Sequence, residues 1–198
     1  MEQTLEPEGA PVNAKIHYLD FSKKSKNQKL SANTVEAQVK ELKPSVPVYF
    51  IRPNSIKRAA KFFLENFSTP KHQSDVLYSV KSNPDAKVLQ HLFNSGIKHF
   101  DVASIAEIKL IDELFGKEAK MYFMHPIKSR ESISDAYFNY GIRDFSLDSS
   151  DELKKILEVT SNAKDLGLHL RLAIPNSHAA IDLSGKFGIL PSRCVGLV

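Results

Sequence analysis

From Val46 onward the chain alternates between short apolar segments and longer segments that carry helix-capping residues. The apolar segments have the length and the β-branched and aromatic content that are typical of buried strands. They cover residues 46–51, 76–80, 97–102, 120–124, 143–147 and 166–174. Strands separated by helical segments pair in parallel, because a parallel pair needs a crossover connection. The alternation therefore predicts an α/β protein made of βαβ units.

Polar residues with a capping side chain stand at the expected helix starts. They are Asn54, Asn83 followed by Pro84, and the S-x-x-E boxes Ser104–Glu107 and Ser149–Glu152. Two further helices are predicted over residues 32–42 and 130–140. Glycines mark the expected helix ends, at Gly96, Gly116 and Gly141. The expected strand ends are about 22 to 26 residues apart, which fits both a doubly wound sheet and a β/α barrel.

The composition excludes several classes of protein. With 27 Lys and Arg against 23 Asp and Glu, the net charge is only +4, and no basic stripe points to nucleic acid. The single cysteine, Cys194, excludes an intramolecular disulfide and a cysteine-rich metal site. No apolar run is long enough to span a membrane, and the N-terminus lacks the apolar region of a signal peptide. We therefore expect a cytoplasmic protein without a metal site, a nucleic-acid partner or a membrane anchor.

Lys81 is the residue that is hardest to explain structurally. It follows the apolar segment VLYSV, where the strands of a parallel barrel open into an active-site mouth. Lysine is rarely buried without an ionic or chemical reason, and a desolvated lysine acts as a nucleophilic amine toward an aldehyde. The alternative is a lysine at a strand end whose stem lies on apolar surface while its amine reaches water.

Six segments around Lys81 resemble the motifs of one family. They are YSVKSNPD (78–85), FDVASIAEI (100–108), HPIKS (125–129), LDSSDEL (147–153), LRL (170–172) and LSGKFGI (183–189). In this order they are similar to the fold-type III pyridoxal-phosphate decarboxylases, the ornithine/diaminopimelate/arginine decarboxylase family, and nearest to its bacterial ornithine or lysine/ornithine branch. The resemblance implies an alanine-racemase-like (β/α)8 TIM barrel, of which this chain holds about five of the eight units.

The resemblance also implies roles for individual residues. Lys81 matches the lysine that holds pyridoxal 5′-phosphate, and Asp101 matches an acidic residue beside this cofactor. Arg171 matches a strand-borne arginine that reaches towards the cofactor, and Glu107 matches a glutamate near it. The structural alternatives are a helix-entry residue for Asp101, an acidic ion-pair partner for Arg171, and a capping-box role for Glu107.

Three further residues bear on the resemblance. Lys186, in the KFG segment, matches a lysine that works at the dimer interface of relatives. Ser79 departs from the family, because relatives usually have alanine there. Cys194 lacks the sequence context of the family's catalytic cysteine, and we do not assign it that role.

The function that the resemblance implies is pyridoxal-phosphate-dependent decarboxylation of a basic amino acid, ornithine first, to a polyamine precursor by a homodimeric enzyme. Two alternatives stay open. One is a non-enzymatic paralogue that binds a partner, like the antizyme inhibitors. The other is a different pyridoxal-phosphate barrel, either a racemase or the small type that serves cofactor homeostasis.

A complete β/α barrel takes about 250 residues, whereas this sequence has 198. The family's phosphate loop, its ring-stacking histidine, its pyridine-binding glutamate and its C-terminal β-domain would all follow Val198. We therefore expect the N-terminal portion of a longer enzyme, inactive alone. Its parts would be a tail with a short helix (1–45), a strand and helix leading into the barrel (46–75), and an incomplete cofactor-binding barrel (76–198).

Overall fold

The computed structural model describes residues 34–67, 74–174 and 185–196. The chain forms two compact units, residues 1–56 and 57–198, each of which is described by itself. In the first unit, helix α1 (Val35–Leu42) begins after Thr34, whose hydroxyl accepts a hydrogen bond from the Ala37 amide at 3.3 Å. The short helix predicted over residues 32–42 is confirmed.

The strand predicted over residues 46–51 is wrong, since the structure assigns no strand there. The segment keeps an alternating pattern of half-buried and exposed side chains, and Tyr49 is 73% exposed. A strand also needs a hydrogen-bonded neighbour. The segment pairs with no other part of the described chain, so β-rich composition alone did not make a strand.

The second unit is built on a five-stranded sheet in which every neighbouring pair is parallel. The strands are β1 (Leu77–Ser79), β2 (His99–Val102), β3 (Lys120–Phe123), β4 (Asp144–Leu147) and β5 (Gly167–Leu170). Their order in the sheet is the order of the sequence. A doubly wound sheet reverses its strand order at a switch point, whereas a barrel adds each strand beside the last. The unit is therefore part of a β/α barrel.

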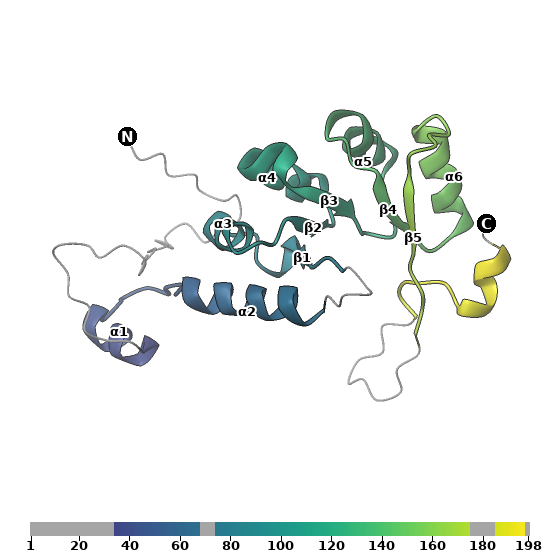
Figure 1. Cartoon of the computed structure of the whole chain (residues 1–198). Helices are drawn as coiled ribbons and strands as arrows, with labels where there is room; N and C mark the ends of the chain where they lie inside the picture. The colour runs from purple at the N-terminus through teal and green to yellow at the C-terminus, as the bar shows by residue number, and fades with distance from the viewer. Residues whose placement is uncertain (1–33, 68–73, 175–184, 197–198) are drawn as a thin grey trace. The chain divides into compact units, whose positions relative to one another are not determined.

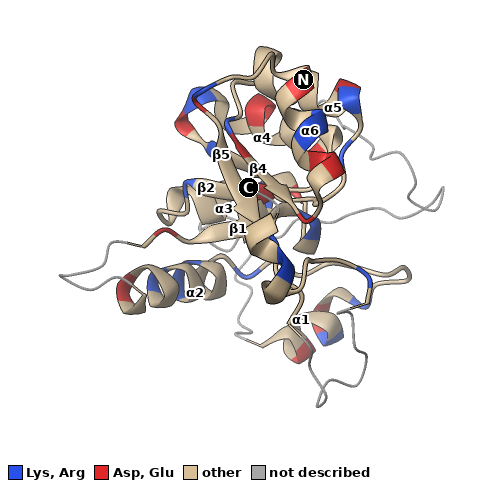
Figure 2. Cartoon of the chain, turned by 90° about the vertical axis from the view of Figure 1, so that its right-hand side faces the viewer, with Lys and Arg blue, Asp and Glu red and all other residues tan. Residues whose placement is uncertain are grey.

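Helices connect successive strands and lie along the outer side of the curving sheet (Figure 1). They are α3 (Ala86–Asn94), α4 (Ile105–Phe115), α5 (Arg130–Ser134) and α6 (Ser150–Val159), and α2 (Pro53–Asn66) precedes β1. Helix α6 carries both acidic and basic residues, coloured red and blue in Figure 2. In the part of the chain that the structure describes, no helix is both long and apolar enough to cross a membrane.

Two of the predicted helix starts are wrong. Helix α2 begins at Pro53, so Asn54 lies inside it. Proline suits this place, because its fixed φ is helical and the first helical amide needs no partner. Helix α3 is capped by Asp85, whose carboxylate accepts hydrogen bonds from the amides of Lys87 (2.9 Å) and Val88 (3.3 Å). The Asn83 side chain instead accepts a hydrogen bond from the Asp85 amide at 3.0 Å.

The helix predicted over residues 130–140 is only partly α-helical. Helix α5 ends at Ser134, and a π-helical turn (Asp135–Asn139) follows. The Tyr140 amide donates to the Asp135 carbonyl at 3.2 Å, which is the i→i+5 bond of a π-helix. Hydrophobic spacing predicts that this segment is helical but does not reveal the wider turn.

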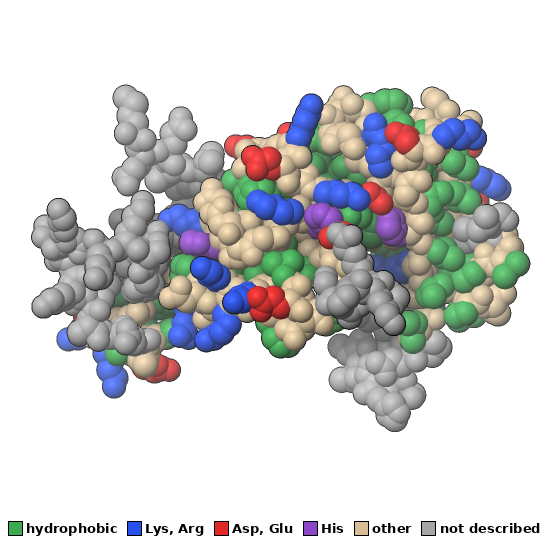
Figure 3. All heavy atoms as spheres, in the orientation of Figure 1, with side chains coloured by type: hydrophobic (Ala, Val, Ile, Leu, Met, Phe, Trp, Pro, Cys, Tyr) green, Lys and Arg blue, Asp and Glu red, His purple; other side chains and the backbone are tan. Residues whose placement is uncertain are grey.

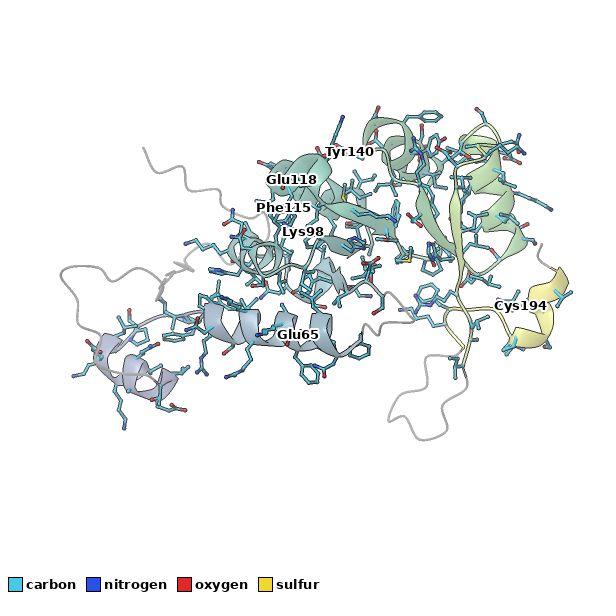
Figure 4. The ribbon with its side chains drawn as sticks, in the orientation of Figure 1. Glu65, Lys98, Phe115, Glu118, Tyr140 and Cys194 are labelled. Atoms are coloured by element: carbon cyan, nitrogen blue, oxygen red, sulfur yellow. The ribbon has the colours of Figure 1, made fainter. Side chains whose placement is uncertain are left out.

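The two faces of the sheet differ in character. On the face toward the helices, Phe100, Val102, Phe123, Phe145 and Leu147 are at most 3% exposed. They pack with apolar residues of the helices, among them Leu89, Ile108, Ile111, Ile133 and Ile156. The edge of this core carries an aromatic stack in which the Phe93 and Phe115 ring centroids are 4.1 Å apart, with the Lys98 ammonium over the Phe93 ring. Figure 4 marks Phe115 and Lys98 at this edge.

The opposite face is polar. Strand register places on it, two residues apart along each strand, His99, Asp101, Lys120, Tyr122, Asp144, Ser146 and His169. Neighbouring strands are linked across it, since His169 pairs with Asp144 at 2.8 Å and the Tyr122 hydroxyl lies 3.2 Å from His99 Nδ1. Figure 3 shows histidine, acidic and basic side chains gathered on this side of the molecule.

Candidate active site

Lys81 lies just beyond the carboxyl end of β1, in a single 3-10 turn (Val80–Ser82). Its side chain is exposed, and no hydrogen bond or ion pair joins it to the described residues. The expectation of a desolvated lysine is therefore wrong for this structure: the turn carries the side chain past the last strand residue, while Val80 beside it is completely buried. The amine is accessible to a ligand.

The Ser79 hydroxyl lies at the same end of the sheet. Ser79 is the last residue of β1 and pairs in register with Asp101 of β2, so the two side chains share the polar face. Ser79 Oγ is buried and has no hydrogen-bond partner among the residues that the structure describes. A buried hydroxyl normally has one, so this group is poised to bond to a ligand.

Asp101 and Glu107 have different surroundings. Asp101 is half-buried on β2 and makes no hydrogen bond or ion pair with the described residues. Glu107 accepts a hydrogen bond from the Ala103 amide at 2.8 Å, and its own amide donates to Ser104 Oγ at 3.3 Å. The capping role of Glu107 is thus confirmed, while its place near the cofactor stays a prediction.

Arg171 follows β5, and its amide donates to the Leu147 carbonyl at 2.8 Å. The side chain is exposed. The acidic partner considered from the sequence is not found within the described chain; the guanidinium carbon lies instead 5.3 Å from the centre of the Phe187 ring. No carboxylate among the described residues therefore neutralises the positive charge of Arg171.

Sequence reasoning missed an aromatic cluster at the carboxyl ends of β3 and β5. The Phe187 ring lies edge-on to the His125 ring, with centroids 5.7 Å apart, as well as near Arg171. Behind it, the Gly188 amide donates to Asp148 Oδ2 at 2.8 Å. The sequence shows HPIKS, LDSSDEL and LSGKFGI as separate motifs. It does not show that Asp148 of the second motif accepts a hydrogen bond from Gly188 of the third, 40 residues later.

A buried ion pair lies beneath this cluster and was also missed. The Lys128 ammonium donates to the His125 carbonyl (2.9 Å), the Ser146 carbonyl (2.5 Å) and Glu152 Oε1 (2.9 Å). The Lys128 side chain is 0% exposed. Burial lowers the pKa of Lys128, and the hydrogen bond to Glu152 opposes this shift. Glu152 lies on α6 and Lys128 lies in the loop between β3 and α5, so their ion pair links this loop to α6. Glu152 also pairs with Lys155, within α6, at 2.6 Å.

The carboxyl end of the sheet thus offers groups that fit pyridoxal 5′-phosphate. An accessible amine, Lys81, can bond to an aldehyde. The partnerless hydroxyl of Ser79 can donate to an oxygen of the ligand, and the guanidinium of Arg171 attracts an anion. Cys194 lies in the 3-10 turn η4 (Pro191–Gly196), marked in Figure 4, where its thiol donates to the Leu190 carbonyl at 3.5 Å.

Comparison with known proteins identifies the family. Residues 53–196 match the family model described as pyridoxal-dependent decarboxylase, pyridoxal binding domain. The lysine/ornithine decarboxylase of Selenomonas ruminantium is 31% identical over 82% of this chain and 39% of its own length. The ornithine decarboxylase of Neurospora crassa is 32% identical over 61% of this chain and 24% of its own length. The chain therefore spans well under half the length of these relatives.

Solved structures agree. An SrLDC mutant in complex with PLP is 26% identical, with a TM-score of 0.68 over 84% of this chain and 41% of that chain. The arginine decarboxylase of Paramecium bursaria Chlorella virus, bound to agmatine, is 26% identical, with a TM-score of 0.63 over 73% of this chain and 37% of its own. The expected fold class is confirmed, and the cofactor of this domain is pyridoxal 5′-phosphate. The chain belongs to the family of pyridoxal-dependent decarboxylases, of which it carries the pyridoxal binding domain.

Proposed function

We propose that this chain binds pyridoxal 5′-phosphate through Lys81 and serves the decarboxylation of a basic amino acid, with ornithine as the first candidate. The observation that carries the proposal is the exposed amine of Lys81 at the carboxyl end of β1, which has no partner among the described residues. The names of the relatives, lysine/ornithine and ornithine decarboxylases, support the substrate class and favour decarboxylation over racemisation.

Each residue of the site has a task in this proposal. The cofactor, when bound, takes up the electrons that the departing carboxylate leaves behind. Lys81 Nζ would hold the cofactor through its aldehyde carbon. Arg171 attracts an anionic group, either of cofactor or of substrate, and Ser79 Oγ donates a hydrogen bond. Asp101, on the same sheet face as Ser79, would accept a hydrogen bond from the bound group.

The cofactor assignment is tested by titrating the 198-residue chain with pyridoxal phosphate and following the visible absorption of the bound group. We expect a saturable spectral change that Lys81→Ala abolishes, because no other described lysine stands at the carboxyl end of β1. The matched control is Lys109→Ala, which removes an exposed lysine from α4. Equal spectra for the two variants would contradict the assignment.

We further propose that the 198 residues alone release no CO2 above the rate of pyridoxal phosphate free in water. Orientation contributes about 7–11 kcal/mol to well-positioned reactions, and exclusion of water strengthens charge interactions in a site. Lys81 and Arg171 are both exposed here, so water is not excluded from these two groups and Lys81 has no described contact that orients its amine. A CO2-release assay with labelled ornithine and lysine measures this. Substrate-saturable release that disappears in Lys81→Ala would show the opposite.

A homodimeric assembly stays a prediction of the resemblance, with Lys186, exposed on the segment after β5, as its proposed interface residue. A cytoplasmic location likewise stays a prediction, made from the composition.

A further inference from the structure

A segment that follows β5 returns to the carboxyl end of the sheet. This return segment, residues 185–190, forms a parallel bridge between Leu172 and Ile189. The Ile189 amide donates to the Arg171 carbonyl at 2.9 Å, and the Ala173 amide donates to the Ile189 carbonyl at 2.9 Å. The backbone of Arg171 is therefore held directly by the return segment.

Gly188 allows the backbone of the return segment to lie close to the backbone of Leu172 and Ala173. Its φ is +101°, and a Cβ atom built on it would lie 2.6 Å from the Ala173 nitrogen. A residue with a side chain would have to move the segment away. The Gly188 amide also donates to Asp148 Oδ2 at 2.8 Å, which ties the return segment to the end of β4.

Phe187, next to Gly188, contacts residues that follow two different strands. Its ring contacts His125 beyond β3 and lies 5.3 Å from the guanidinium carbon of Arg171 beyond β5. The Lys186 ammonium also lies 5.3 Å from the ring centre. An aromatic face attracts a cation without neutralising its charge, so the contact with Phe187 leaves the charge of Arg171 available to an anion.

We propose that Phe187 and Asp148 are positioning residues for Arg171. The Phe187 ring orients the guanidinium toward the anionic group of the ligand, and the bond between Asp148 and Gly188 keeps the ring in place. This inference rests on the proposed binding of pyridoxal phosphate for the task of Arg171, but the positioning itself belongs to the chain without ligand.

The positioning is measured first without any cofactor. Hydrogen exchange of the Gly188 and Ile189 amides should speed up about tenfold or more in Asp148→Ala, because an anchoring hydrogen bond to a carboxylate is lost. Asp148→Asn, which keeps an acceptor oxygen, should restore most of the protection. Exchange that is unchanged in Asp148→Ala would overturn the anchoring role.

The second measurement is the affinity for pyridoxal phosphate. A cation–π contact at an exposed site corresponds to about a two- to fivefold change in affinity. We expect a loss of this size in Phe187→Leu, which keeps apolar bulk, and recovery in Phe187→Tyr, which keeps the aromatic face. In an Arg171→Ala background, Phe187→Leu should have no further effect, as expected for coupled residues.

The outcomes separate the two proposals. Phe138→Ala, which removes an exposed phenylalanine of the π-helical turn, is the matched control and should bind as the parent does. Equal losses in Phe187→Leu and Phe187→Tyr, or losses that add to Arg171→Ala, would overturn the positioning role. If the parent chain binds no pyridoxal phosphate, the proposed function fails, while the exchange measurement still decides the anchoring.

Discussion

Glu152→Ala should lower the free energy of unfolding by about 3–5 kcal/mol, because it leaves a buried ammonium without its counter-charge. Lys128 is 0% exposed, and Glu152 is the only carboxylate within ion-pair distance of it in the described chain. In this variant Lys128 still donates to the His125 and Ser146 carbonyls, but these bonds do not offset the free-energy cost of burying its charge. Urea unfolding followed by circular dichroism measures the loss.

Asp151→Ala is the control for this prediction, since it removes an exposed carboxylate from the same first turn of α6. It should cost no more than about 1 kcal/mol, the usual limit for a charge at a helix start. Replacing both partners, as Lys128→Met with Glu152→Leu, should recover much of the stability, because a buried pair is often replaceable by apolar residues. A Glu152→Ala variant as stable as Asp151→Ala would contradict the importance of the pair.

Phe100→Ala should also cost about 3–5 kcal/mol, the usual range for removing a buried phenylalanine side chain. Phe100 is 0% exposed in the middle of the sheet's apolar face, and its ring lies 5.7 Å from that of Phe115. The loss consists of the buried apolar surface and of the cavity left between β2 and α4. Thermal or urea unfolding checks the value.

Phe138→Ala serves as the control here as well, because Phe138 is 58% exposed. A surface substitution of this kind usually changes stability by less than about 0.5 kcal/mol. If both variants lost the same stability, the assignment of the helix-covered face as the core would be wrong.

Much of the barrel could be predicted from the sequence, because its signals are local. Five apolar segments became the five strands, and the serines of both S-x-x-E boxes accept hydrogen bonds from the glutamate amides at 3.3 Å. The glutamates differ, however. Glu107 stays in its own capping turn, whereas Glu152 turns to Lys128, 24 residues earlier in the sequence. Only tertiary packing decides between these partners.

The errors have the same origin. Residues 46–51 have strand-like composition, but a strand depends on a partner that the segment itself does not contain. Asn83 and Asp85 can both cap a helix, and Asp85 is the residue that caps α3. Its carboxylate accepts hydrogen bonds from two amides, and its negative charge is favourable at the positive end of the helix dipole. Lys81 follows an apolar segment whose composition is typical of a buried strand, although Leu77 of β1 is exposed. The 3-10 turn that leaves the Lys81 side chain exposed cannot be recognised from hydrophobicity.

The residues of the candidate site were chosen from the sequence, and their roles stay predictions. Lys81 and Arg171 follow β1 and β5, Asp101 lies one residue before the end of β2, and their residue types alone suggest chemistry. The contacts that hold Arg171 could not be foreseen, because they depend on a return of the chain to β4 and β5 that involves the backbone of Gly188.

The central claim is that Lys81 is the lysine that holds the cofactor. Pyridoxal phosphate in less than equimolar amount, followed by borohydride reduction and peptide mapping by mass spectrometry, tests it most directly. The reduction makes the bond between lysine and cofactor permanent, so the labelled peptide identifies the lysine. The structure predicts that the label lies on Lys81, in preference to exposed lysines such as Lys109 and Lys154. A label spread evenly over the exposed lysines of a folded chain, or absent from Lys81, would contradict the account.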